Sequence, residues 1–235
     1  MFDFSGRYAV VTGGGRGIGE AIVRRLAADG AAGVAVLDVG DIPYAKELDP
    51  SGKKIFPVAC DVANRADTAE AFRRIYEAFG RIDFMINNAG IARDAMFHKM
   101  DDDNWDLVID VDLHGAYNCT RQVINKMRDQ EYGRILFTSS IAVYGAVGQS
   151  NYGAAKGALV ALTKTIAREQ RQKGITVNCI IPGGVETAMT ANLQRSENAP
   201  RLGKPEEIAS LIAYLCTDEA SYISGACIDI NGGSH

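Results

Sequence analysis

Seven short runs of mostly apolar residues recur along this chain of 235 residues, and a polar or glycine-rich segment follows each of them. Runs of this length, without a strict alternation of polar and apolar positions, are typical of strands buried on both faces of a parallel sheet. They span residues 8–11, 34–37, 54–59, 84–86, 135–138, 175–181 and 226–230.

Segments with the periodicity of amphipathic helices lie between these runs. Ile18, Ile22 and Leu26 recur every four residues, and Gly30 follows as a helix terminator. Further helical segments are predicted over residues 41–48, 65–79, 101–127 and 150–172, and from Pro205 onward. Strands that alternate with helices, without repeats or linkers, predict one α/β domain over residues 1–235. We expect a doubly wound, Rossmann-like parallel sheet of seven strands with helices on both faces.

A glycine-rich turn connects the first predicted strand to the first predicted helix. It reads Thr-Gly-Gly-Gly-Arg-Gly-Ile-Gly over residues 12–19. Glycines allow the backbone to turn tightly and to approach a pyrophosphate, while the helix N-terminus offers free N–H groups and the positive end of its dipole. A plain turn would explain the glycines but not their position between a strand and a helix. The turn therefore predicts a dinucleotide-binding site.

The second predicted strand is followed by Asp38, nineteen residues after Gly19. An acidic side chain at this position binds the adenosine ribose hydroxyls and repels a 2′-phosphate, which favours NAD over NADP. Arg16 argues for the opposite preference, because a guanidinium beside the turn could hold that phosphate. An arginine can turn toward solvent, whereas a carboxylate in direct contact excludes the phosphate. We therefore predict NAD as the cofactor and NADP as the less favoured one.

Tyr152 and Lys156 are four residues apart in a predicted helix, so their side chains lie on one face. A free tyrosine titrates near pH ~10, and a nearby cation favours the phenolate. Such a pair could exchange a proton with a substrate at working pH. The same spacing also occurs by chance at helix edges, so the prediction depends on what surrounds the pair.

The composition argues against several other classes of protein. A formal net charge of -4 with no basic run argues against a nucleic-acid surface. No apolar run approaches the ~20 residues that span a bilayer, and the start lacks the pattern of a secretion signal. The three histidines lie far apart and no cluster has metal-ligand spacing, so no metal site is predicted. The five cysteines are scattered, which fits a reducing cytoplasm.

The chemically distinctive residues follow the carboxyl ends of the predicted strands, where α/β sheets bind their ligands. They are the glycine turn, Asp38, Asp61, the Asn-Asn-Ala-Gly of residues 87–90, Ser140 and Pro182-Gly183. Together with Tyr152-x-x-x-Lys156, these motifs resemble the short-chain dehydrogenase/reductase family in order and spacing, from about Arg7 to the end of the chain. Residues 90–100 also resemble the 3-oxoacyl carrier-protein reductases and acetoacetyl-CoA reductases within that family.

The resemblance implies a hydride transfer between a nicotinamide and a substrate carbon that needs no metal. Tyr152 would be the general acid/base, Lys156 would bind the nicotinamide ribose, and Ser140 would hydrogen-bond the reacting oxygen. Homodimers or homotetramers that use residues 101–127 and 150–172 are also implied. The implied cofactor-binding residues are Gly13, Gly15, Arg16, Gly17, Ile18, Gly19, Asp38, Asp61, Val62, Asn88, Ala89, Gly90, Tyr152, Lys156, Pro182, Gly183, Val185 and Thr187.

The chain departs from the family pattern at Asp112, where the family has a fourth catalytic residue, an asparagine that helps to hold a water in a proton relay to the lysine. A carboxylate can accept the same hydrogen bonds but carries a charge and cannot donate while ionised. It is either a tolerated replacement, or it retunes the pH optimum or weakens the enzyme. We expect Asp112→Asn to leave turnover unchanged or to raise it.

Two further departures concern the substrate side of the predicted site. Ser140 lies twelve residues before Tyr152, where thirteen is usual, so either the intervening loop is shorter or Ser139 faces the substrate. Only one of two adjacent strand residues can point inward, and the family pattern favours Ser140. The segment between Thr190 and Arg201 is short and polar, so it would cover less of a long acyl chain.

These observations predict an oxidoreductase that interconverts a secondary alcohol and a ketone, with a 3-oxoacyl thioester of acyl carrier protein or coenzyme A as the candidate substrate. The alternative is a catalytically weak NAD-binding protein used for sensing or scaffolding, which only Asp112 favours. An isomerase or epimerase is less favoured, because such relatives usually carry a larger C-terminal substrate domain.

Overall fold

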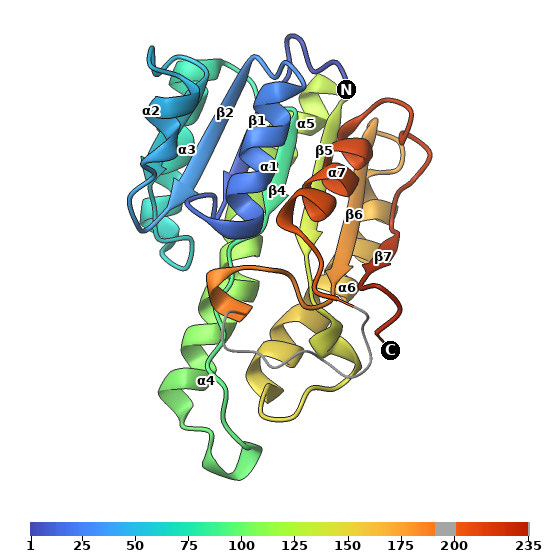
Figure 1. The fold of residues 1–235 in the computed structure, drawn as a ribbon. Helices are drawn as coiled ribbons and strands as arrows, with labels where there is room; N and C mark the ends of the chain where they lie inside the picture. The colour runs from blue at the N-terminus through green and yellow to red at the C-terminus, as the bar shows by residue number, and fades with distance from the viewer. Residues whose placement is uncertain (191–200, 235) are drawn as a thin grey trace.

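The computed structural model describes residues 1–190 and 201–234, and a seven-stranded parallel sheet forms its centre (Figure 1). Across the sheet the strand order is β3-β2-β1-β4-β5-β6-β7. The predicted α/β fold with seven parallel strands is confirmed. The strands are β1 (Tyr8–Thr12), β2 (Gly33–Asp38), β3 (Ile55–Ala59), β4 (Phe84–Asn87), β5 (Gly133–Thr138), β6 (Ile175–Pro182) and β7 (Cys227–Ile230).

Helices cover both faces of the sheet, as predicted (Figure 1). Alternate residues of β1 serve two separate cores. Val11 belongs to the core that contains Leu26 and Ile212, whereas Val10 belongs to the core that contains Phe72 and Leu159. Both faces of β1 are therefore apolar, which explains the unbroken apolar run of this strand in the sequence. On the first face lie α1 (Gly17–Ala28), α2 (Tyr44–Leu48) and α7 (Pro205–Cys216), and on the second lie α3 (Arg65–Phe79), α5 (Gly115–Gln130) and α6 (Ser150–Gln170).

The long helix predicted over residues 101–127 is interrupted. It consists of α4 (Asp102–Ile109), a π-helical turn η2 (Asp110–His114) and then α5. A π-helical turn accommodates one extra residue and occurs mostly at functional sites. The helix α4, which precedes this turn in the chain, extends past the carboxyl edge of the sheet (Figure 1).

The strand boundaries differ from the predicted ones chiefly at β5, which begins at Gly133 and therefore includes Arg134. Arg134 is buried, its guanidinium lies over the Tyr132 ring, and it forms an ion pair with Asp218 at 2.9 Å. A charged residue interrupts an apolar run in sequence, but these partners make its burial possible.

Some segments have no counterpart among the predicted elements. Short 3-10 turns occur at η1 (Phe97–Lys99), η3 (Ile141–Tyr144) and η4 (Ala188–Thr190). Residues 191–200, which make up most of the predicted substrate-covering segment, lie outside the described residues. Within the described ranges, none of the helices combines the length and apolarity that crossing a membrane requires.

Candidate active site

The glycine-rich turn and the segment after β4 form one unit at the carboxyl edge of the sheet. The Thr12 hydroxyl accepts hydrogen bonds from the backbone N–H groups of Asn88 and Ala89, each at 3.0 Å. The Asn88 side chain donates to the carbonyl oxygens of Thr12 and Gly13 at 3.1 and 3.2 Å. Gly13 has φ +60°, and a Cβ there would lie 2.8 Å from the Ala89 Cα. Only glycine allows this contact between the two segments.

The turn leads directly into the N-terminus of α1, which offers hydrogen-bond donors. Gly17 begins α1 with φ +58°, and in the part of the chain that the structure describes no side chain caps this helix N-terminus. The first N–H groups of α1 are therefore open to an anion, at the positive end of the helix dipole. Thr187 faces the turn from the other side, because a Cβ on Gly17 would lie 3.3 Å from its Cγ2. These residues fit the pyrophosphate of a dinucleotide.

Asp38 is fixed beside the turn at the end of β2. Its carboxylate accepts hydrogen bonds from the backbone N–H groups of Gly15 at 2.8 Å and Gly40 at 3.0 Å. A Cβ on Gly15 would lie 2.8 Å from the Asp38 Oδ2, so the carboxylate lies against the turn itself. Arg16 is exposed at the surface next to it.

Tyr152 and Lys156 share one face of α6, as their spacing predicts. The Lys156 Nζ lies 5.4 Å from the centroid of the Tyr152 ring. The same Nζ donates to the carbonyl oxygen of Thr138, at the end of β5, at 3.0 Å. It also lies 3.0 Å from the Oδ2 of Asp112, and both side chains of this ion pair are buried. The Lys156 ammonium thus contacts both the Thr138 carbonyl and the Asp112 carboxylate, close to the Tyr152 ring.

Asp112 reaches the pair from the π-helical turn. Its Oδ1 accepts a hydrogen bond from the backbone N–H of Ile91 at 2.8 Å. A Cβ on Gly90 would lie 2.8 Å from the Oδ2 of Asp112 and 2.9 Å from the Nζ of Lys156. The segment after β4 therefore contacts both halves of the site, since Asn88 binds the glycine turn and Gly90 lies against Lys156.

The two buried charges influence each other's pKa. Burial raises the pKa of the Asp112 carboxyl, against the opposing effects of the Lys156 ammonium and the Ile91 N–H. Burial also disfavours the charged form of Lys156, but the Asp112 carboxylate and Tyr152 outweigh it, so the pKa of Lys156 is raised. The lysine is therefore a cation at neutral pH.

The two neighbouring serines differ in their surroundings. Ser139 is buried, and its hydroxyl donates to the backbone oxygen of Lys156 at 2.9 Å. Ser140 is partly exposed, and its Oγ accepts a hydrogen bond from the Ala142 N–H at 3.2 Å. The proton of the Ser140 hydroxyl remains available to a substrate oxygen, which favours Ser140 as the residue that faces the substrate.

We expect Ser140→Ala to lower kcat by about a hundredfold, because a donor to the reacting oxygen is lost. Ser139→Ala should keep kcat within a few-fold and lower the free energy of unfolding by about 1 kcal/mol, through its lost hydrogen bond. Steady-state kinetics and urea denaturation of both variants test this. The reverse pattern, with turnover lost only in Ser139→Ala, would exchange the two assignments.

The remaining predicted cofactor residues lie at the same edge of the sheet. Asp61 follows β3, and its carboxylate accepts a hydrogen bond from the Ala63 N–H at 3.0 Å. Ile18 is in the first turn of α1 and packs partly against the core. Val62 and Val185 are buried, and Pro182 and Gly183 end β6 and follow it. Their roles remain predictions.

Sequence reasoning did not find Asn151, the residue before Tyr152. Its side chain is buried and donates to the backbone oxygens of Arg93 at 3.1 Å and Asn104 at 3.2 Å. It thereby fixes the start of α6 to the segment after β4 and to α4. An asparagine in the first turn of a predicted helix, next to a candidate catalytic residue, is the signal that could have indicated it.

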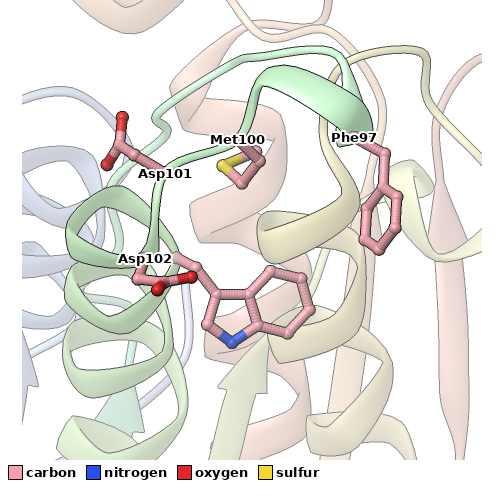
Figure 2. Close-up of a pocket in the computed structure, with 5 residues that line it drawn as sticks. Phe97, Met100, Asp101 and Asp102 are labelled. Atoms are coloured by element: carbon pink, nitrogen blue, oxygen red, sulfur yellow. The ribbon is translucent and has the colours of Figure 1, made fainter.

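A hollow of about 270 Å³ lies near the start of α4 (Figure 2). It is lined by Phe97, Met100, Asp101, Asp102 and Trp105, none of which belongs to the predicted site. The predicted site is therefore described by the contacts of its residues and not by this hollow. Among the described residues, no three His, Cys, Asp or Glu side chains gather as a metal ion would require.

Comparison with known proteins gives concordant matches over almost the whole chain. A family model described as short chain dehydrogenase matches residues 7–198. An acetoacetyl-CoA reductase from Allochromatium vinosum is 41% identical over 240 residues, which cover 97% of this chain and 98% of that protein. The 3-oxoacyl-[acyl-carrier-protein] reductase FabG from Thermotoga maritima is 37% identical over 243 residues, covering 97% of each chain. FabG from Escherichia coli is 37% identical over 244 residues, covering 99% of each chain. The resemblance indicated by the motifs is confirmed, and the chain belongs to the short-chain dehydrogenase family.

Proposed function

We propose that this oxidoreductase interconverts the 3-oxo and 3-hydroxy forms of an acyl thioester, with acyl carrier protein or coenzyme A as the thiol group. The observation that supports it is the segment after β4, which joins a dinucleotide-type glycine turn to a buried Lys156 beneath Tyr152. The chain also spans nearly the full length of relatives named as 3-oxoacyl and acetoacetyl-CoA reductases. The catalytically weak sensor or scaffold is not favoured.

The proposed roles of the residues follow from their contacts. A bound nicotinamide supplies or accepts the hydride. In the reductive direction Tyr152 donates a proton to the substrate oxygen while the Ser140 hydroxyl holds that oxygen. Lys156, held by the Thr138 carbonyl and Asp112, presents its charge to Tyr152 and to the nicotinamide ribose.

We further propose where the cofactor binds. The N-terminus of α1 and its glycine turn would hold the pyrophosphate, and Asp38 would hold the adenosine ribose. The residues after β4 and the Val185–Thr187 region would lie along the nicotinamide half. NAD is the proposed cofactor, because two backbone N–H groups fix the Asp38 carboxylate against the turn and prevent it from moving away from a 2′-phosphate.

A screen of 3-oxoacyl thioesters of increasing chain length, run in parallel with NADH and NADPH, tests both proposals. We expect turnover, with kcat/KM for NADH above that for NADPH by about tenfold or more, because like charges in contact repel. Asp38→Ala should reduce that ratio, whereas Asp41→Ala, which removes a nearby exposed carboxylate, should leave it unchanged. A higher kcat/KM for NADPH in the unmodified enzyme would contradict the proposed role of Asp38. Tight cofactor binding without turnover on any thioester or simple ketone would favour the sensor instead.

Assembly and compartment are also proposals. Leu107 on α4 and Tyr117 on α5 are 42% and 43% exposed, which supports a homodimer or homotetramer that uses these helices. All five cysteines carry free thiols, which supports a reducing cytoplasm as the compartment.

A further inference from the structure

We propose that Asp112 is a positioning residue that acts on the reaction through Lys156, by fixing the direction of its ammonium group and balancing its charge through a direct ion pair. The inference rests on the proposed function and deepens it. It develops one of the alternatives that the sequence left open for Asp112, a carboxylate that retunes the pH dependence.

The first argument is that the contact is direct. The Asp112 Oδ2 and the Lys156 Nζ are 3.0 Å apart, and their side chains are 0% and 3% exposed. Gly90 closes the space beside them, because a Cβ there would lie within 2.9 Å of both groups. At this separation no water molecule fits between the two charges.

The second argument concerns the direction of the ammonium. An ammonium has three N–H donors. One donates to the Thr138 carbonyl oxygen at 3.0 Å, and the Asp112 Oδ2 lies 3.0 Å from the same nitrogen in an ion pair. The centroid of the Tyr152 ring lies 5.4 Å from the same nitrogen. Asp112 thus fixes the position of the Lys156 ammonium through the ion pair, although it does not itself reach the reacting atoms.

The third argument is that Asp112 is itself held rigidly. The backbone N–H of Ile91 binds its second oxygen at 2.8 Å. The π-helical turn directs Asp112 inward while Asp110 and His114 lie outside, where they are both 52% exposed and bond to each other at 2.7 Å. The carboxylate therefore belongs to the packed interior and does not turn out to solvent.

The charge balance predicts a direction for the pH dependence. The titratable groups that act on Lys156 are Asp112 from the π-helical turn, Tyr152 on its own helix and Cys179 from β6. Burial raises the pKa of Cys179 to about 12, so this thiol stays neutral below that pH. Asp112 is the largest of the effects that offset the burial of Lys156, ahead of Tyr152. When the carboxylate is removed, burial dominates and Lys156 loses its proton at a lower pH.

The test is the pH profile of kcat/KM for thioester reduction in the Asp112→Asn variant. We expect the alkaline limb of the profile to move to lower pH by about one pH unit or more, because the Lys156 ammonium loses the carboxylate that offsets its burial. Asp110→Asn is the matched control, since it removes a carboxylate from the same turn without touching Lys156, and its profile should coincide with that of the unmodified enzyme. Coincident alkaline limbs in Asp112→Asn and the unmodified enzyme would overturn the proposal.

A second measurement is independent of turnover. Thermal midpoints are compared for the Asp112→Asn, Lys156→Met and doubly substituted proteins. If the ion pair is direct, the double substitution should lower the midpoint by less than the sum of the two single effects. Additive effects would overturn the proposal even in an active enzyme. If no thioester is turned over, the proposed function fails, but the thermal cycle still decides whether Asp112 and Lys156 are coupled.

Discussion

Replacing Tyr152 by phenylalanine is expected to lower kcat by about a hundredfold to ten-thousandfold. The substitution removes only the hydroxyl, so the ring that lies 5.4 Å from the Lys156 Nζ remains. The cofactor should bind as before, because the glycine turn and Lys156 are unchanged. Steady-state kinetics with a 3-oxoacyl thioester, together with NADH titration by fluorescence, separate the loss of chemistry from a loss of binding.

Tyr76→Phe is the matched control for this experiment. Tyr76 is on α3 and packs against the core, and its hydroxyl donates to the backbone oxygen of Gln122 on α5 at 3.5 Å. Its removal should leave kcat within a few-fold. If Tyr152→Phe also kept kcat within a few-fold, another group would have to supply the proton, and the proposed role of Tyr152 would be wrong.

The second large effect is expected from Gly19→Ala. A Cβ at this position would lie 2.0 Å from the Gly13 carbonyl oxygen and 2.8 Å from the Asn88 Nδ2. Both contacts belong to the unit that joins the turn to β4, so the backbone would have to move. We expect the free energy of unfolding to fall by about 3 kcal/mol or more and NADH binding to weaken strongly.

Urea denaturation and NADH titration check this prediction, with Gly203→Ala as the control. A Cβ on Gly203 would meet its nearest neighbour at 3.7 Å, which is ordinary contact. That variant should stay within about 0.5 kcal/mol of the unmodified protein. Equal stability and equal NADH affinity in the two variants would show that the turn is more adaptable than the contacts indicate.

The parts of the fold that depend on local patterns could be predicted from the sequence. Strands buried on both faces produce unbroken apolar runs, and amphipathic helices produce apolar positions about four residues apart. The order of strands and helices could therefore be predicted from the sequence. Tyr152 and Lys156 could be placed on one face of a helix because they are separated by about one helical turn. The edge of the sheet at which the motifs meet follows from parallel strands alone.

The parts that depend on contacts between distant segments could not be predicted. Residues 101–127 contain no proline that would interrupt a helix, so one continuous helix was predicted there and the π-helical turn was not. That turn determines that Asp112 meets Lys156, from a different helix, without an intervening water. The partner that allows Arg134 to lie within β5 is Asp218, far along the chain. The two-residue alternation of a strand predicts that one of two serines faces inward, but not which one.

The packing of α1 against α7 has a consequence for how the protein is made. Leu26 near the start of the chain and Ile212 near its end belong to one core, and the two helices lie side by side on the sheet (Figure 1). During translation α1 leaves the ribosome long before α7 has been synthesised. Its apolar face therefore stays uncovered for most of the synthesis, which is the condition under which nascent chains aggregate or recruit chaperones. The arrival of α7 completes this core, so we expect this face of the sheet to pack only after α7 has left the ribosome.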